Sequence, residues 1–240
     1  MKRNIASYLV ISALLAAIFL APVVVADPYG VNEANAGTSE RYDTSGISAK
    51  QVNAQAGNVT ELTLNATAIT NGWQGFYGNI TGKIILADAS GNNFYDWDLA
   101  MPSGEVYAAR TDSITWSGVN CSNATEVGSE NDFLNKSASD PDSVTNTFNV
   151  TSHPWFLIGS NNITGCYSTK AYDSSGGQGS GFWQVLLSDG SSNTIYSTII
   201  ESSGLTGFNN QNWQFELLVA ENGKPGYEST TPYYFFVELE

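Results

Sequence analysis

Along most of the chain, apolar residues alternate with polar ones, which is the pattern of a β-strand with one buried face. The clearest examples lie near the carboxyl end, where Trp213–Val219 and Tyr233–Leu239 place an apolar side chain at every second position. Similar or shorter apolar stretches predict further strands at Leu62–Ala68, Lys83–Ala87, Tyr95–Leu99, Glu105–Ala109, Ile114–Trp116, Val144–Val150, Trp155–Ile158, Phe182–Leu187 and Thr194–Ile200. No stretch after residue 26 keeps a helical period for three turns.

Turn signals such as Asn71-Gly72, Asp140-Pro141-Asp142 and Asp189-Gly190 separate these stretches. About ten to twelve short strands with little helix are typical of an all-β fold, an antiparallel β-sandwich or a Greek-key barrel. We expect one such domain over residues 58–240.

The amino terminus has the layout of a secretory signal. Lys2 and Arg3 precede an apolar stretch, and Val24-Val25-Ala26 offers a small-residue cleavage site. Residues 1–26 therefore predict a signal helix that is removed. The alternative is a retained anchor, because residues 5–26 carry no charge and are long enough to span a bilayer. Either outcome exports the chain, so we expect a secreted or cell-surface protein whose membrane contact, if any, is through residues 5–26.

Residues 27–57 contain only scattered apolar positions and predict an extended segment. A short strand over Lys50–Ala56 is the exception, since Val52, Ala54 and Ala56 alternate with polar residues. So few apolar side chains cannot offset the entropy of ordering some thirty residues. The segment is thus expected to be a tether, or a strand donated to a neighbouring copy.

The charge and composition exclude several classes of protein. There are 23 acidic against 9 basic residues, a net charge of −14, which argues against nucleic-acid binding. One His and two Cys cannot form zinc, haem or iron–sulfur ligand sets, and no Gly-rich phosphate motif is present, so we expect no metal and no cofactor. The loops Asp88–Asn93 and Asp140–Asp142 are rich in oxygen ligands for calcium, but ordinary turns also explain them.

Two features fit an oxidising, glycosylating compartment. Cys121 and Cys166 are expected to form a structural disulfide, with two buried thiols as the alternative. Asn-x-Ser/Thr occurs eight times and predicts N-glycosylation, at Asn58, Asn65, Asn79, Asn120, Asn123, Asn135, Asn149 and Asn162. Because Asn120 and Asn123 are close neighbours, we do not expect both to carry a glycan.

Enzyme chemistry has little support in the sequence. His153 is the single His, and no Gly-x-Ser-x-Gly motif accompanies it, so a surface or capping His at the start of a strand is expected instead. Asp96 and Asp98 share one strand face and are the best carboxylate pair for a glycosidase, although alternating acids usually mark a solvated face. Exposed aromatic rings that could bind sugars in a carbohydrate-binding module are Trp73, Phe76, Tyr77, Trp97 and Trp116, with packing into the core as the alternative.

The stretches Gly57–Leu62, Trp73–Asn79, Phe94–Trp97 and Pro102–Tyr107 resemble a group of uncharacterised secreted archaeal cell-surface proteins. The resemblance implies export and a cell-surface setting, and it supplies no catalytic or binding residue. We therefore expect an exported, N-glycosylated protein that is not an enzyme and has a structural or adhesive role in a coat or filament. Its partners would be copies of itself, other surface proteins or glycans. A carbohydrate-binding module is the alternative, followed by a glycosidase-type enzyme.

Overall fold

The computed structural model describes residues 27–43, 45–222 and 230–239. Its principal sheet contains seven strands, and every pairing in it is antiparallel. The strand order begins with β1 (Tyr29–Gly30), β15 (Tyr234–Leu239), β5 (Gly104–Ala109), β11 (Thr194–Ile199) and β10 (Gln178–Ser188). Both β6 (Asn120–Cys121) and β9 (Ser168–Tyr172) then pair with β10. The predicted all-β antiparallel fold is confirmed.

A second layer of two strands, β2 (Trp73–Gly78) and β14 (Phe215–Ala220), covers one face of this sheet. The core between the layers is built around Tyr196, Leu186 and Leu217, which are almost completely buried. The opposite face is covered by a second apolar cluster that includes β7 (Phe156–Ile158), β8 (Asn161–Ile163) and the 3-10 helix η1 (Trp116–Gly118). With two strands against seven, the layer formed by β2 and β14 is much narrower than the principal sheet that it covers.

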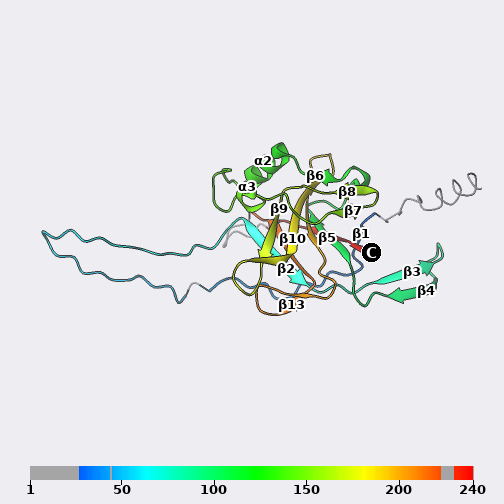
Figure 1. Cartoon of the computed structure of the whole chain (residues 1–240), viewed down its shortest axis with the longest axis horizontal. Coiled ribbons are helices and arrows are strands. Elements are labelled where there is room, and N and C mark those ends of the chain that lie inside the picture. Colours follow the sequence, from blue (N-terminus) through cyan, green and yellow to red (C-terminus); the bar gives the residue numbers. More distant parts are fainter. Residues whose placement is uncertain (1–26, 44, 223–229, 240) are drawn as a thin grey trace, which may run out of the picture.

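The remaining four strands of the described residues form two further hairpins. β3 (Lys83–Ala87) and β4 (Asn93–Asp98) form a hairpin that projects from the body, and β12 (Leu205–Thr206) pairs with β13 (Asn212–Trp213) (Figure 1). The described part of the chain thus has fifteen strands, more than predicted, because several of them contain only two or three residues.

The body also contains two helices that were not predicted from the sequence. α2 (Ala124–Phe133) begins with a capping box, in which Asn123 accepts from the N–H groups of Thr125 and Glu126, and Glu126 accepts from the N–H of Asn123. α3 (Val144–Thr147) lies where a strand was expected over Val144–Val150, so that prediction was wrong. The four-residue spacing of Val144 and Phe148, both buried, fits one helical turn against the core.

An ion pair fixes α2 to the principal sheet. Glu130 is 3% exposed and pairs with the guanidinium of Arg110, while the Tyr196 hydroxyl donates to the same carboxylate at 2.8 Å. Burial raises the pKa of Glu130, but hydrogen bonds and charge from Arg110 outweigh it, so the net pKa lies below the usual value. The guanidinium also lies over the Phe133 ring at 4.1 Å.

The segment between β1 and β2, residues 31–43 and 45–72, contains no helix or strand where it is described, and we call it the arm. It leaves the body as two long legs that meet at a turn near Gly57 (Figure 1). Strands were expected at Lys50–Ala56 and Leu62–Ala68, and neither is present, because no strand in the described part of the chain pairs with them. Conversely, Tyr29 and Gly30 pair with β15, although they fall in the stretch expected to be a tether.

Candidate interaction surface

The outer edge of β2 is open. In an antiparallel pair, alternate residues direct both backbone groups toward the partner strand. Gly72 accepts from the Glu221 N–H at 2.9 Å, so the backbone groups of the next residue, Trp73, and of Gly75 and Tyr77 point away from β14. Within the described residues, β2 pairs with β14 alone, and no backbone hydrogen bond reaches these outward groups.

The other edge of the second layer is covered by side chains: Gln184 binds its middle, and the Tyr233 hydroxyl donates to the Ala220 carbonyl at 2.7 Å. Gln184, 1% exposed, donates from Nε2 to the Glu216 carbonyl at 2.5 Å and accepts from the Leu218 N–H at 2.8 Å. Its amide therefore takes the place of a neighbouring strand along β14. Sequence reasoning missed this residue, because nothing in its local pattern shows that a polar side chain in a core strand meets a sheet edge.

A groove of about 2770 Å³ follows the second layer; its lining includes β2 and residues 31–40 on one side, and Lys170 and Gln184 on the β14 side. Its floor includes Phe235, Val237 and Leu239 of β15, which are only half-buried, whereas Phe236 and Glu238 on the opposite face of the same strand are buried. The ring of Phe76 meets Phe235 edge-on, with 5.2 Å between centroids. The floor is incompletely covered because the second layer ends at β2.

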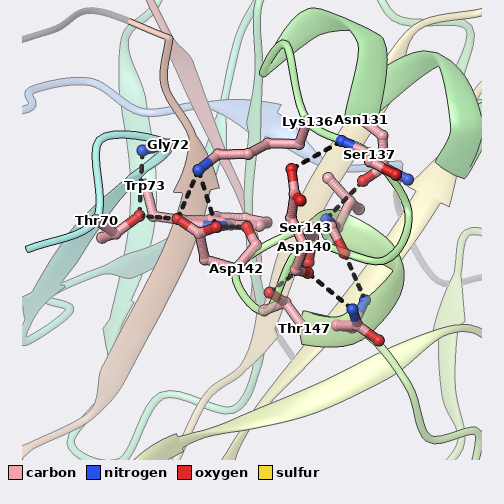
Figure 2. A network of polar contacts seen from close by, with 12 residues as sticks. Thr70, Gly72, Trp73, Asn131, Lys136, Ser137, Asp140, Asp142, Ser143 and Thr147 are labelled. Carbon is pink, nitrogen blue, oxygen red and sulfur yellow. Dashed lines mark hydrogen bonds and ion pairs between the residues drawn. The ribbon is translucent and has the colours of Figure 1, made fainter. Parts of the chain in front are cut away.

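The root of the arm is held beside this edge by a polar network centred on Asp142 (Figure 2). The Thr70 hydroxyl donates to the Asp142 carboxylate at 2.8 Å, and the Lys136 ammonium binds the same carboxylate at 2.8 Å. Trp73 Nε1 donates to the Asp142 carbonyl at 2.8 Å. The hydrogen bond from Lys136 lowers the pKa of Asp142. These contacts fix the direction in which the arm leaves β2.

The loops proposed for calcium have other contacts in the structure. Asp142 binds Lys136, and Asp140 accepts from the Ser137 N–H at 2.9 Å. Asp88 accepts from the N–H groups of Ser90 and Asn92, which is an Asx turn. In the part of the chain that the structure describes, no group of three or more His, Cys, Asp or Glu side chains converges.

The five aromatic residues considered for sugar binding separate into two groups. Trp73, Phe76 and Trp116 pack against the body, whereas Tyr77 and Trp97 are 46% and 50% exposed. The Tyr77 ring lies 4.9 Å from Trp213 and 5.1 Å from Phe208, centroid to centroid. Tyr77 and Trp213 are inclined by 58°, so these rings form an exposed aromatic cluster rather than a flat platform.

The projecting hairpin has one apolar face, and its other face carries three charged side chains beside the exposed Ile85. Cross-strand pairing places Ile84 opposite Trp97 and Leu86 opposite Tyr95, and all four side chains are exposed. On the other face, the Lys83 ammonium lies 2.9 Å from Asp96 and 3.2 Å from Asp98. Asp96 and Asp98 therefore share a face, as the alternation indicated, and both contact the same cation.

His153 and the cysteines lie together under the principal sheet. Cys121 and Cys166 form a disulfide with sulfur atoms 2.00 Å apart. The N–H of Cys166 donates to His153 Nε2 at 3.0 Å, and Nδ1 lies 2.7 Å from the Pro154 carbonyl. The expected surface position of His153 is wrong: the residue is buried, and burial lowers its pKa although the Pro154 hydrogen bond opposes this.

All eight sequon asparagines are exposed, as a glycan requires. Asn58 and Asn65 lie on the arm, and Asn79 directly follows β2. Asn123 caps α2 through its side-chain oxygen, which leaves its nitrogen as the glycan acceptor.

Comparison with family models, curated proteins and solved structures finds no match to this chain. The predicted signal at 1–26 lies outside the described residues. Within those residues, no helix combines the length and apolarity needed to cross a bilayer.

Proposed function

We propose that this chain is an exported, N-glycosylated cell-surface protein with a structural or adhesive role, as a component of a coat or filament. The observation that carries the proposal is the arm, whose apolar side chains have no partner strand among the described residues of their own molecule. Val59 and Leu64 are 102% and 79% exposed, and the hairpin adds a second exposed apolar face. Exposed apolar surface of this kind is typical of a protein that associates with a partner.

Two further observations support export. Eight sequons in one chain, all of them exposed, suit a protein that passes through a glycosylating pathway. The disulfide suits a compartment that keeps thiols oxidised. The low fraction of charged residues, 13%, suits a stable coat whose surface is mainly Ser, Thr and Asn.

The test is antibody labelling of intact cells, with labelling of lysed cells as the control. We expect the intact cells to be labelled along a surface lattice or filament, and the protein to migrate above its 25.7 kDa sequence mass until glycans are removed. Labelling that requires lysis would refute the proposal.

A carbohydrate-binding module is the second candidate, because Tyr77, Phe208 and Trp213 gather on the surface. A glycan array tests it with the variants Tyr77→Ala and Trp213→Ala. Trp155→Ala is the control, since Trp155 is 67% exposed and lies outside the cluster. Saturable binding that is lost in the first two variants and kept in the control would favour the module over the structural role.

A further inference from the structure

We propose that residues 60–69 of one copy add as a strand to the outer edge of β2 in a second copy. This rests on the proposed role in a coat or filament, for which it names the partner. The donated strand would hydrogen-bond to the outward groups of Trp73, Gly75 and Tyr77. Its apolar face would cover Phe235, Val237 and Leu239 in the groove.

The donor segment has the pattern of a strand with one buried face. Leu62, Leu64, Ala66 and Ala68 lie on one side, and they alternate with Glu61, Thr63, Asn65 and Thr67. It contains neither Gly nor Pro, and Leu62 and Leu64 are 55% and 79% exposed. The Asn65 sequon falls on the polar side, so a glycan there would point away from the acceptor.

The acceptor presents the backbone groups and the surface that such a strand needs. β2 offers six residues of edge, and the half-buried floor beside it continues the core between the two layers. The contrast with β14 is informative, because Gln184 binds the Glu216 carbonyl and the Leu218 N–H of that edge, while no described side chain binds the outward backbone groups of β2. Residues 31–40 of the same molecule also line the groove, but Val31 is their single large apolar side chain, so they cannot cover its floor.

The network at the root of the arm disfavours insertion into the same molecule. To lie beside β2 of its own chain, residues 60–69 would have to reverse direction across Asn71 and Gly72. Gly72 is buried, its carbonyl accepts from Glu221, and Thr70 is bound to Asp142 (Figure 2). The arm instead leaves the body beyond the Trp73 end of β2 (Figure 1).

Donor and acceptor are different surfaces of one molecule, so a pair of copies still has one free donor segment and one free acceptor edge. Such a head-to-tail contact generates a ring or an open filament rather than a closed twofold dimer. An open filament is the form that suits a surface fibre.

The experiment measures association of the purified full chain by light scattering over a hundredfold concentration range. We expect oligomers in the unaltered protein and at least a tenfold weaker association in the double variant Leu62→Asp, Leu64→Asp. The matched control is Val52→Asp, Ala54→Asp, which changes the other leg of the arm and should associate normally. Gly75→Pro should also weaken association, because it removes an outward N–H that has no partner within the described residues. Melting temperatures equal to that of the parent establish that each variant is folded.

Cysteine pairing identifies the strand directly. Copies carrying Leu64→Cys are mixed with copies carrying Val237→Cys and oxidised, and we expect a disulfide-linked pair of the two variants. Three results would overturn the inference: no such pair, a link formed within one molecule that carries both substitutions, or equal loss of association in the control variant. Monomers in solution from a protein found on the cell surface would refute the inference alone. Oligomers from a protein found inside cells would refute the proposed function alone.

Discussion

Replacing Glu130 by Gln tests whether the ion pair with Arg110 holds α2 on the sheet. The carboxylate is 3% exposed, and its partner guanidinium is 28% exposed, so water screens the pair only partly. Breaking a buried pair costs about 3–5 kcal/mol, and the remaining amide hydrogen bonds and the partial exposure of Arg110 reduce this to about 2–3 kcal/mol. For a protein of this size, that loss corresponds to a decrease in melting temperature of about 5–10 °C.

The pH dependence of this variant provides an independent check. The pKa of Glu130 is lower in the folded protein than in the unfolded chain, so its stabilisation is fully present above about pH 4.5. It is lost as the pH falls through the folded-state pKa. The difference between parent and Glu130→Gln, followed by circular dichroism, should therefore shrink between pH 7 and pH 3. The control is Glu61→Gln on the exposed arm, which should melt as the parent does. A difference below 1 °C at pH 7, or one that grows in acid, would refute the reasoning.

Three further predictions concern the body of the protein. Free-thiol labelling of the native protein should detect no free cysteine, and stoichiometric labelling would contradict this. Replacing Cys121 and Cys166 by Ser should lower the free energy of unfolding, measured in urea, by about 4 kcal/mol, because the opened loop gains entropy in the unfolded chain. The pKa of His153 is depressed, so the unfolded chain binds the proton more readily, and stability should fall as the pH drops below about 6.5. His153→Gln should remove that part of the pH profile, and an unchanged profile would exclude the role of the imidazole. Gln184→Leu should cost about 2–4 kcal/mol, because it leaves the buried carbonyl of Glu216 and the partly buried N–H of Leu218 without this partner. A loss below about 1 kcal/mol would contradict the prediction.

Period-two alternation identified those strands whose two faces differ in the fold. β15 is the clearest case, since Phe236 and Glu238 turn to one cluster while Phe235 and Val237 turn to the other. α2 was missed because its residues show no strong amphipathic pattern, and the one local signal is the capping pair Asn123 and Glu126. β2 was missed as a strand because Gly75 and Gly78 interrupt its apolar pattern.

The strand predicted from the alternation at Leu62–Ala68 is not present, because a pattern in one chain cannot show whether a neighbouring strand is available to pair with it. The same limit applies to the open edge of β2, because pairing partners are set by tertiary structure. The residues that were weighed as candidates for chemistry lie among packing contacts and turns. His153 accepts a backbone hydrogen bond, and Asp142 anchors the arm.

Electron cryo-microscopy of native cell-surface material tests the central proposal most directly. We expect filaments or a lattice in which each copy of the body carries an additional strand beside β2, continuous with residues 60–69 of the adjacent copy. Glycan density should extend from Asn65 on the side that faces solvent. Surface assemblies that lack this protein would contradict the proposed function, and assemblies that contain it with the edge of β2 unoccupied would contradict strand donation.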